Sequence, residues 1–563
     1  MNMRRSAFMP TADLIIENAS ALTLDPSQPR ADTIALRGGV ILAIGDRARL
    51  AGIVSSATRR IDAGGNSVLP GFIDSHIHLF SGGAQLQSLS LAGLTGFNSV
   101  AAVIRDRDAR EPGTGILICE QAAYAIFGDH KPTTRQTLDR ILPDRPLALF
   151  ASDHHTMWAN TAALRAAGIL HGRKIAPGNE IVLDADGLAT GELREFEAYR
   201  PVTDLAPGGG RDMLGLMGYE PAEPPTPAQR AVDKDVLRRA LAYCASLGIT
   251  SFHNMDGNFY QLELLAEIDA EQGLPVRARV PFRMLPGMPL SALDKAAEMR
   301  GRWHSDRLKS DFVKMFMDGV IESTTADMFE DYAGMPGVHG TSLFEQDEFD
   351  AICIEADRRG LQIAVHAIGD AAVNRTLNGY EAAQRANGRR DSRHRIEHIE
   401  MLAPADLPRF ADLGVLASVQ PTHAPGAAYP IEPILSMVGK ERMRTGYAWQ
   451  TLRRAGARLV FSSDWPVAPL DPLLGIRMAM TRQPAFAGAP DERQTLADSI
   501  RGFTHDGAFA EFSENRKGVL KPGAMADLVI LSGDIETSPP EAIDEMTVAA
   551  TICEGRITYE QGA

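Results

Sequence analysis

The sequence predicts an α/β fold: a (β/α)8 TIM barrel with a composite β-sandwich domain from both termini and a large insertion after strand 1. Three observations predict it. Short apolar runs, typical of buried parallel strands, recur along the chain. Helical patterns such as residues 371–387 separate the later runs. Both ends of the chain instead contain short strands punctuated by turns, as in a small β-rich domain.

Eight apolar runs supply the strands of the predicted barrel. They end near residues 78, 254, 285, 317, 367, 399, 420 and 463. One strand plus one helix takes roughly 30 residues, so the gaps between the later runs match one or two such units. Residues 319–343 are then a long loop. Eight alternating units imply a closed barrel, whose chemistry lies at the carboxyl ends of its strands.

The predicted domains follow from the positions of these runs. Residues 70–514 form the barrel, and residues 1–69 plus 515–563 form the composite β-sandwich domain, because neither end is long enough to bury a core alone. Residues 84–230 are far more than one barrel helix needs and contain Pro/Gly-rich segments, so they form an insertion. An insertion after strand 1 rises on the active-site face, and we expect it to cover the substrate.

Composition and charge exclude several classes of protein. The chain is 44% hydrophobic and 23% charged, which is ordinary for a globular protein. A net charge of −15 without a Lys/Arg-rich stripe argues against nucleic acid and anionic membranes as partners. Four widely spaced cysteines favour a reducing compartment, and no apolar run is long enough to span a membrane. We therefore expect a cytoplasmic protein that acts on a small molecule.

The most informative motif is His76-Ile77-His78, at the end of the first apolar run. In a strand, residues i and i+2 point to the same face, so both imidazoles project to one side, as two ligands of one metal ion require. Neutral imidazole is the commonest protein ligand for zinc and similar ions. An isolated His-x-His pair also arises by chance, so its weight depends on the later strand ends.

Four later apolar runs each contain a further candidate metal ligand at or near the end of the run. Lys314, His366, His398 and Asp464 lie at the ends of strands 4, 5, 6 and 8 of the predicted barrel. Because the carboxyl ends of barrel strands meet at one face, we expect these side chains to gather there with the histidine pair.

Five motifs carry a family resemblance over almost the whole chain. They are, in order, PGFIDSHIH, VKMFMDG, VHAIGD, RIEHIE and SSDWPV. Together they resemble the metal-dependent amidohydrolase superfamily, in particular its amidohydrolase 3 or YtcJ-like branch, which contains the N-substituted formamide deformylases. The resemblance implies a composite domain beside the barrel, one or two divalent metal ions with zinc expected, and a homodimer as the family-level oligomer.

The resemblance also implies how the candidate ligands divide between two metal ions. The ligands of the first ion would be His76, His78 and Asp464. The ligands of the second would be His366 and His398.

Lys314 needs a separate account, because a protonated lysine repels a cation. The resemblance implies that it is N6-carboxylated, so that the carbamate gives one oxygen to each ion. The alternative is an unmodified ammonium paired with Asp318 or Glu322. The site would then hold one ion, and His398 would orient water or substrate.

The predicted mechanism follows from charge. A metal ion lowers the pKa of bound water from about 15.7 to about 7, giving hydroxide at neutral pH. Hydroxide would attack a polarised carbonyl, and Asp464 would carry the proton of the water to the leaving nitrogen. We predict hydrolysis of a C–N bond in an amide, formamide or cyclic amide. The alternatives are a mononuclear deaminase or imidazolone-type hydrolase, an ester, lactone or carbamate hydrolase, and a non-catalytic regulatory protein on the same fold.

Five further residues are candidates for substrate binding. They are His155, Trp158, Asp318, Gln420 and His423. The first two lie in an insertion segment that resembles one in the family, where His154 replaces the usual glycine. Asp318 follows Lys314 by four residues, and the last two follow strand 7. For each residue, packing or the positioning of a ligand is the competing interpretation.

Overall fold

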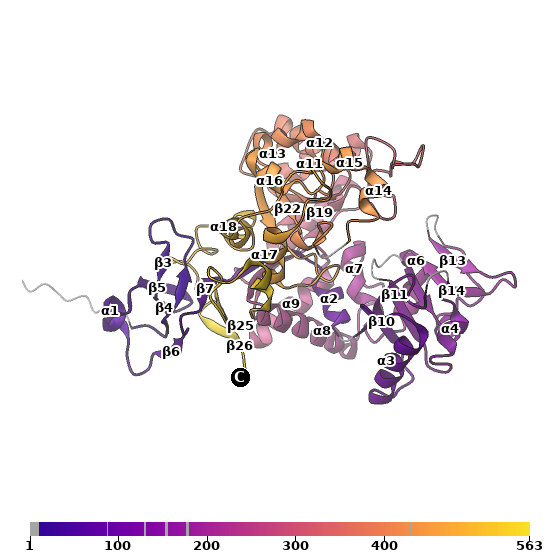
Figure 1. The fold of residues 1–563 in the computed structure, drawn as a ribbon, viewed down its shortest axis with the longest axis horizontal. Coiled ribbons are helices and arrows are strands. Elements are labelled where there is room, and N and C mark those ends of the chain that lie inside the picture. The colour runs from indigo at the N-terminus through magenta and orange to yellow at the C-terminus, as the bar shows by residue number, and fades with distance from the viewer. Residues whose placement is uncertain are drawn as a thin grey trace, which may run out of the picture. The chain divides into compact units, whose positions relative to one another are not determined.

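The computed structural model describes residues 11–86, 88–128, 131–151, 156–175, 179–427 and 430–562. The chain divides into two compact units, one made of Met1–His78 and Leu241–Ala563 and the other of Leu79–Ala240. Each unit contains its own sheets and its own buried core (Figure 1).

Two parallel sheets form the centre of the first unit. The four-stranded sheet has the order β18-β16-β15-β8, and the six-stranded sheet has the order β17-β19-β20-β21-β22-β23. Most of these strands are buried at every residue, as expected for parallel strands covered on both faces. The strands are β8 (Phe72–Ile77), β15 (Ile249–Asn254), β16 (Arg277–Arg279), β17 (Phe282–Arg283), β18 (Leu308–Lys309), β19 (Phe312–Phe316), β20 (Gln362–Ala367), β21 (Arg395–His398), β22 (Leu416–Val419) and β23 (Arg458–Phe461).

Each of the eight predicted runs contains a strand, but the third run is split into β16 and β17. The fourth run gives β19, and the short strand β18 precedes that run. Pro281 lies between β16 and β17, and proline has no N–H to donate to a ladder. The two parallel sheets are separate, and among the described residues β8 meets the segment after β23 only through an isolated bridge between Ile77 and Trp465. The strands therefore do not form one closed sheet. The mixed α/β fold is confirmed, whereas closure into a (β/α)8 barrel stays a prediction.

Helices alternate with the strands of this unit. The pattern over residues 371–387 is found as α12 (Asp370–Asn387), and Figure 1 shows α11, α12, α13 and α16 around β19 and β22. None of the described helices is both long and apolar enough to cross a membrane. The other helices of the unit are α1 (Arg47–Leu50), α9 (Phe259–Gln272), α10 (Leu293–Arg302), α11 (Gln346–Arg358), α13 (Leu407–Leu413), α14 (Ile434–Val438), α15 (Lys440–Met443), α16 (Trp449–Arg454), α17 (Pro472–Thr481), α18 (Leu496–Gly502) and α19 (His505–Ala510).

Strands from both ends of the chain share one sheet, in the order β26-β25-β24-β7-β2-β3. β7 pairs with β24 in antiparallel register, with Leu69 opposite Val529. A second sheet, β5-β4-β1-β6, shares a core with it that includes Ile16, Leu36 and Ile530. The predicted bounds of this composite domain stay a prediction. Its strands are β1 (Leu14–Glu17), β2 (Ser20–Leu22), β3 (Arg30–Ala31), β4 (Thr33–Arg37), β5 (Val40–Gly45), β6 (Arg59–Asp62), β7 (Ser67–Pro70), β24 (Leu528–Leu531), β25 (Val548–Cys553) and β26 (Arg556–Glu560).

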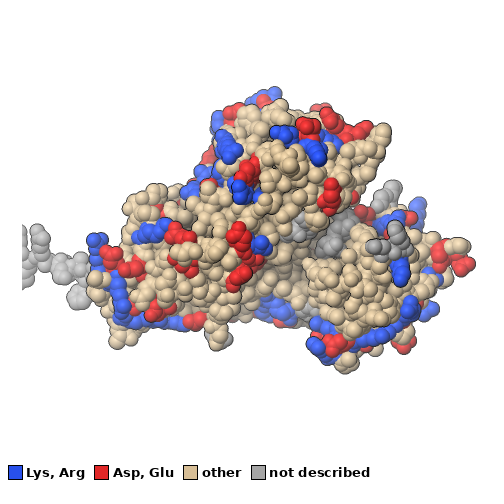
Figure 2. Space-filling model, in the orientation of Figure 1, with Lys and Arg blue, Asp and Glu red and all other residues tan. Residues whose placement is uncertain are grey.

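The second unit is built on a mixed six-stranded sheet in the order β13-β14-β12-β11-β10-β9. Two clusters of buried apolar side chains pack on it. Its elements are α2 (Leu79–Gln85), β9 (Leu89–Ser90), α3 (Phe97–Arg110), β10 (Leu117–Ala122), α4 (Arg135–Asp139), β11 (Leu147–Ala151), β12 (Thr156–Ala159), α5 (Thr161–Ala166), β13 (Glu180–Leu183), β14 (Ala189–Arg194), α6 (Phe196–Thr203), α7 (Arg211–Met217) and the start of α8 (Pro227–Ser246). Figure 2 shows basic and acidic side chains interspersed over the visible face of the described residues.

Candidate metal centre

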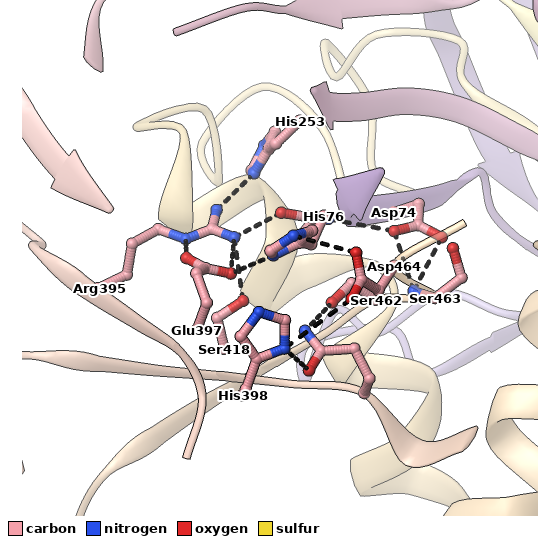
Figure 3. Close-up of polar contacts among 12 residues, drawn as sticks. Asp74, His76, His253, Arg395, Glu397, His398, Ser418, Ser462, Ser463 and Asp464 are labelled. Carbon is pink, nitrogen blue, oxygen red and sulfur yellow. Dashed lines mark hydrogen bonds and ion pairs between the residues drawn. The ribbon is translucent and has the colours of Figure 1, made fainter. Parts of the chain in front are cut away.

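The candidate ligands of the first unit gather at the carboxyl ends of its parallel strands. His76 lies on β8, with His78 just after it, and His398 is the last residue of β21. Asp464 follows β23 by three residues. Each side chain is at least nine-tenths buried. Figure 3 shows His76, His398 and Asp464 pointing toward one another, and their ligand atoms lie within 4.8 Å of each other.

Asp464 is the centre of this group. Its Oδ1 lies 3.2 Å from Nε2 of His76 and 3.1 Å from Nε2 of His78, yet it makes no hydrogen bond to any described residue. The other ring nitrogen of each histidine faces a carboxylate: Nδ1 of His76 lies 2.8 Å from Glu397 and Nδ1 of His78 lies 2.5 Å from Asp256. Because a carboxylate accepts, these Nδ1 atoms carry protons, and Nε2 of each histidine faces Oδ1 of Asp464.

The buried carboxylates around His78 favour a positive charge beside Asp464. Burial would lower the pKa of His78, but the charges of Asp256 and Asp464 outweigh it and raise that pKa to about 10. Burial likewise opposes the charge of Asp464, but His76 and His78 hold its pKa well below the usual range. The carboxylates of Asp256 and Asp464 thus surround the two histidines with buried negative charge, which a cation stabilises. The residues therefore fit a divalent metal ion held by His76, His78 and Asp464.

His366 and His398 continue the cluster. Their rings lie 4.5 Å apart, and His398 lies 5.0 Å from the ring of His76. Nδ1 of His398 donates to the amide oxygen of Gln420 at 2.9 Å, and Nε2 of His366 donates to the carbonyl of Gly319 at 3.1 Å. Burial lowers the pKa of His366 to about 3 and that of His398 well below its usual value, so both present neutral imidazole.

Lys314 lies on β19 and is completely buried. Its Nζ makes no hydrogen bond to any described residue and lies 4.5 Å from the ring centre of Phe316. Burial lowers the pKa of this amine to about 7. The alternative of an ammonium paired with Asp318 or Glu322 stays untested, although the carboxylate of Asp318 is used elsewhere. It accepts the backbone N–H groups of Asp327, Ile368 and Gly369 at 3.0, 3.0 and 2.8 Å.

Two of the ligand positions have an unusual backbone. His398 has φ 75° and Asp464 has φ 61°, both in the left-handed region that non-glycine residues seldom adopt. Such conformations cost of order 1–3 kcal/mol each and persist where the surrounding structure imposes them, often at functional sites. The strain here falls on two residues that must turn their side chains toward a common point.

The residues predicted to bind substrate have different surroundings. Gln420 donates to Oγ of Ser462 at 2.9 Å while it orients His398, and Nε2 of His423 lies 3.8 Å from Oδ2 of Asp464. Trp158 lies on β12 in the core of the second unit, 5.2 Å from the ring of Tyr124. His155 lies outside the described residues. Substrate contacts by these residues, and by Asp318, stay predictions.

Sequence reasoning missed the carboxylates that support the ligands. Glu397 immediately precedes His398, and Asp256 follows the end of β15 by two residues. Asp74 accepts the backbone N–H groups of His76 and Ser463, at 3.1 Å each, and so ties the two ligand segments together. Their position at or beside the ends of buried strands was the available signal, since a carboxylate buried there needs a partner.

Comparison with known proteins agrees with these motifs. A model of the amidohydrolase family matches residues 59–559. The chain is 32% identical to Protein LONG AFTER FAR-RED 3 of Arabidopsis thaliana, over 92% of this chain and 87% of the relative. It is 30% identical to the putative amidohydrolase YtcJ of Bacillus subtilis, over 94% and 96%. It is 26% identical to the N-substituted formamide deformylase of Arthrobacter pascens, over 98% of each chain.

A solved structure shows the same fold. The crystal structure of an uncharacterized metal-dependent hydrolase from Pyrococcus horikoshii superposes with a TM-score of 0.72 at 24% identity, over 91% of this chain and 96% of the other. The match of the family model to most of the chain, together with the two relatives of 30% identity or more, settles the assignment. The chain belongs to the amidohydrolase family.

Proposed function

We propose that this chain is a metal-dependent hydrolase of a C–N bond in an amide, formamide or cyclic amide. One observation carries the proposal: two imidazole Nε2 atoms lie 3.2 and 3.1 Å from Asp464 Oδ1, which has no hydrogen bond to any described residue. Family membership supports hydrolysis, and the relative named N-substituted formamide deformylase supports the class of bond.

The chain would hold one or two divalent metal ions. We expect zinc, because zinc accepts both imidazole and carboxylate ligands. His76, His78 and Asp464 would hold the first, and His366 and His398 the second. An ion bound there supplies a water molecule that is deprotonated near neutral pH and polarises the substrate carbonyl.

Asp464 is suited to carry the proton. One oxygen faces the two Nε2 atoms, while Oδ2 lies 4.0 Å from His398 and 3.8 Å from His423. In the proposed reaction Asp464 accepts a proton from the attacking water and gives it to the leaving nitrogen. A C–O bond forms, the C–N bond breaks, and the products are a carboxylic acid and an amine. The ring of His423 would orient the carbonyl.

Lys314 is proposed to be N6-carboxylated. Its buried Nζ has no hydrogen bond to a described residue, and a pKa of about 7 leaves much of the amine neutral at physiological pH. A neutral amine attacks the carbon of CO2, forming an N–C bond and releasing one proton to solvent. The resulting anion would add an oxygen ligand between the two histidine groups. We further propose a closed barrel, a small-molecule substrate and a homodimer.

Elemental analysis of protein prepared without chelator, with bicarbonate present, tests the metal content. We expect about two ions per chain, fewer in Lys314→Ala, and no change in Lys295→Ala, whose lysine is exposed on α10. About one ion, unaffected by Lys314→Ala, would favour the mononuclear deaminase-like alternative. Protein that takes up no ion under any loading condition would refute metal-dependent hydrolysis.

A matched pair of substrates tests whether the enzyme hydrolyses a C–N bond or a C–O bond. An N-substituted formamide and the formate ester of the corresponding alcohol share a carbonyl and differ in the leaving atom. We expect release of amine from the formamide, with Asp464→Asn slower by on the order of 100-fold or more. Ester cleavage without formamide cleavage would favour the esterase alternative.

A further inference from the structure

A continuous series of buried polar side chains runs behind His76, away from Asp464 (Figure 3). Glu397 accepts from Nδ1 of His76 at 2.8 Å, and Arg395 in turn donates to both oxygens of Glu397, at 2.5 and 2.9 Å. His253 accepts from Nη1 of Arg395 at 2.8 Å. All four side chains are 0–1% exposed, so water does not substitute for any of these bonds.

Arg395 has acceptors in every direction. Nη2 also donates to the carbonyl of Ser75 and to Oγ of Ser418, whose distance is 2.9 Å. Nε and Nη2 are thus held by Glu397 and its neighbours, and Nη1 is held by His253. A guanidinium is a planar group, so the acceptor at Nη1 also fixes the rotation of the face that binds Glu397.

This contact defines the protonation of His253. Because arginine can only donate, Nδ1 of His253 must carry a lone pair, and the ring proton is on Nε2. Nε2 faces Oε2 of Glu511 at 3.6 Å, and Glu511 is bonded to Lys517 at 2.5 Å. Burial lowers the pKa of His253 to about 3, which agrees with a neutral ring beside a guanidinium.

We propose that His253 is a positioning residue for the metal centre: by accepting from Arg395 it fixes Glu397, and through Glu397 it aims Nε2 of His76 at Asp464. This inference rests on the proposed metal dependence. His253 itself would touch neither ion nor substrate. Its contribution is an acceptor at one defined place, which a side chain of the same volume without that acceptor cannot replace.

The link from His253 to His76 passes through one oxygen. Oε2 of Glu397 accepts from both Arg395 and His76. Without the acceptor at Nη1, the buried Arg395 would turn toward another oxygen, because an unpaired charged donor is costly. The turn would shift Oε2, and His76 would follow it. Loss of partners that orient a metal-binding histidine typically weakens metal affinity 10–100-fold. Because His253 lies further from the metal ligand than such a partner, we expect its loss to weaken metal affinity by the low end of that range.

Two substitutions of His253 distinguish the role of its hydrogen-bond acceptor from that of its side-chain volume. His253→Asn keeps an oxygen near the position of Nδ1, and His253→Leu has similar bulk without an acceptor. We would measure the zinc dissociation constant of full-length protein by chelator competition, and the visible spectrum of the Co²⁺-loaded protein. We expect affinity about tenfold weaker and an altered spectrum for His253→Leu, and affinity within twofold of the parent for His253→Asn.

The control is Thr551→Val, which removes a buried hydrogen bond to the carbonyl of Ala245 in the sheet of the composite domain. It should lower thermal stability without changing zinc affinity or the Co²⁺ spectrum. Should His253→Leu fail to fold, His253→Gln tests the same point, since its amide oxygen lies at the place of Nε2 and not Nδ1. Equal affinity in parent and His253→Leu, or equal weakening by Asn and Leu, overturns the inference while metal binding stands. A parent that binds no zinc overturns both.

Discussion

Glu397→Gln is the sharpest single test of how this centre is supported. Both oxygens of Glu397 accept: Oε1 from Arg395, and Oε2 from Arg395 and from Nδ1 of His76. Glutamine must place an NH2 group against at least one of these donors, so no rotamer satisfies them all. The substitution also leaves Arg395, which is fully buried, without its counter-charge.

The magnitude follows from these two losses. Breaking a buried ion pair by removing one partner costs about 3–5 kcal/mol of stability. Loss of the carboxylate that orients a ligand histidine costs about 10–100-fold in metal affinity. Urea unfolding of the metal-free protein measures the first quantity, and zinc competition against a chelator measures the second.

Glu492→Gln is the matched control for Glu397→Gln. Glu492 is 5% exposed, and its two oxygens accept from the hydroxyl and the backbone N–H of Thr451, at 2.5 and 2.9 Å. That hydroxyl can turn to accept from an amide, and the charge of Glu492 acts on the buried Arg482 without a direct ion pair among the described residues, so we expect a smaller loss of stability than in Glu397→Gln and unchanged zinc affinity. If the two variants matched each other in stability and in zinc affinity, the argument from Glu397 would be refuted.

Three further predictions concern stability. Burial disfavours the charged form of Asp357, but hydrogen bonds from His394 and its neighbours lower the pKa of this carboxyl from 3.8 to about 2. Its contribution to the free energy of unfolding, about 1–2 kcal/mol, should be complete above pH 4 and be lost as the pH falls through 2. Unfolding of Asp357→Asn across this range should lack that pH dependence. Gly257→Ala would place Cβ 1.7 Å from the carbonyl of Pro281 and should cost at least about 3 kcal/mol, whereas Gly301→Ala, in open space on α10, should be neutral or slightly stabilising; equal melting temperatures would contradict this. Removal of zinc by chelation should lower the free energy of unfolding by about 2.7 kcal/mol relative to protein with free zinc at 100 times its Kd, and an unchanged melting temperature would argue against a site specific to the folded state.

Much of the centre could be predicted because it depends on local pattern and strand direction. His76 and His78 share a face through the period of a strand, and parallel strands bring their ends to one edge. His366, His398 and Asp464 follow from the same rule. The split of the third run was not anticipated, although Pro281 lies at the break and cannot donate to a ladder.

The rest depends on contacts between segments far apart in sequence. Which carboxylate faces which imidazole is set by the relative placement of β8, β15 and β21, which no motif encodes. The same holds for Asp318, whose oxygens are taken by the backbone N–H groups of two other segments. Trp158 illustrates the limit for apolar residues: a buried indole in a strand suits a core and a pocket equally, and the structure places it in the core of the second unit.

The arrangement of charge supports the proposal that this centre holds a cation. From the far end, the buried series contains Lys517, Glu511, His253, Arg395, Glu397, His76 and Asp464. Lys517, Glu511, Arg395 and Glu397 alternate in charge along the series, so each of the two glutamates has a cation beside it. Asp464 ends the series, facing Nε2 of His76 and of His78. A buried carboxylate facing two ring nitrogens offers the ligand types that divalent ions such as zinc accept. A divalent ion bound there would extend the alternation of charge, and His253 and Arg395 would hold that end of the series in place.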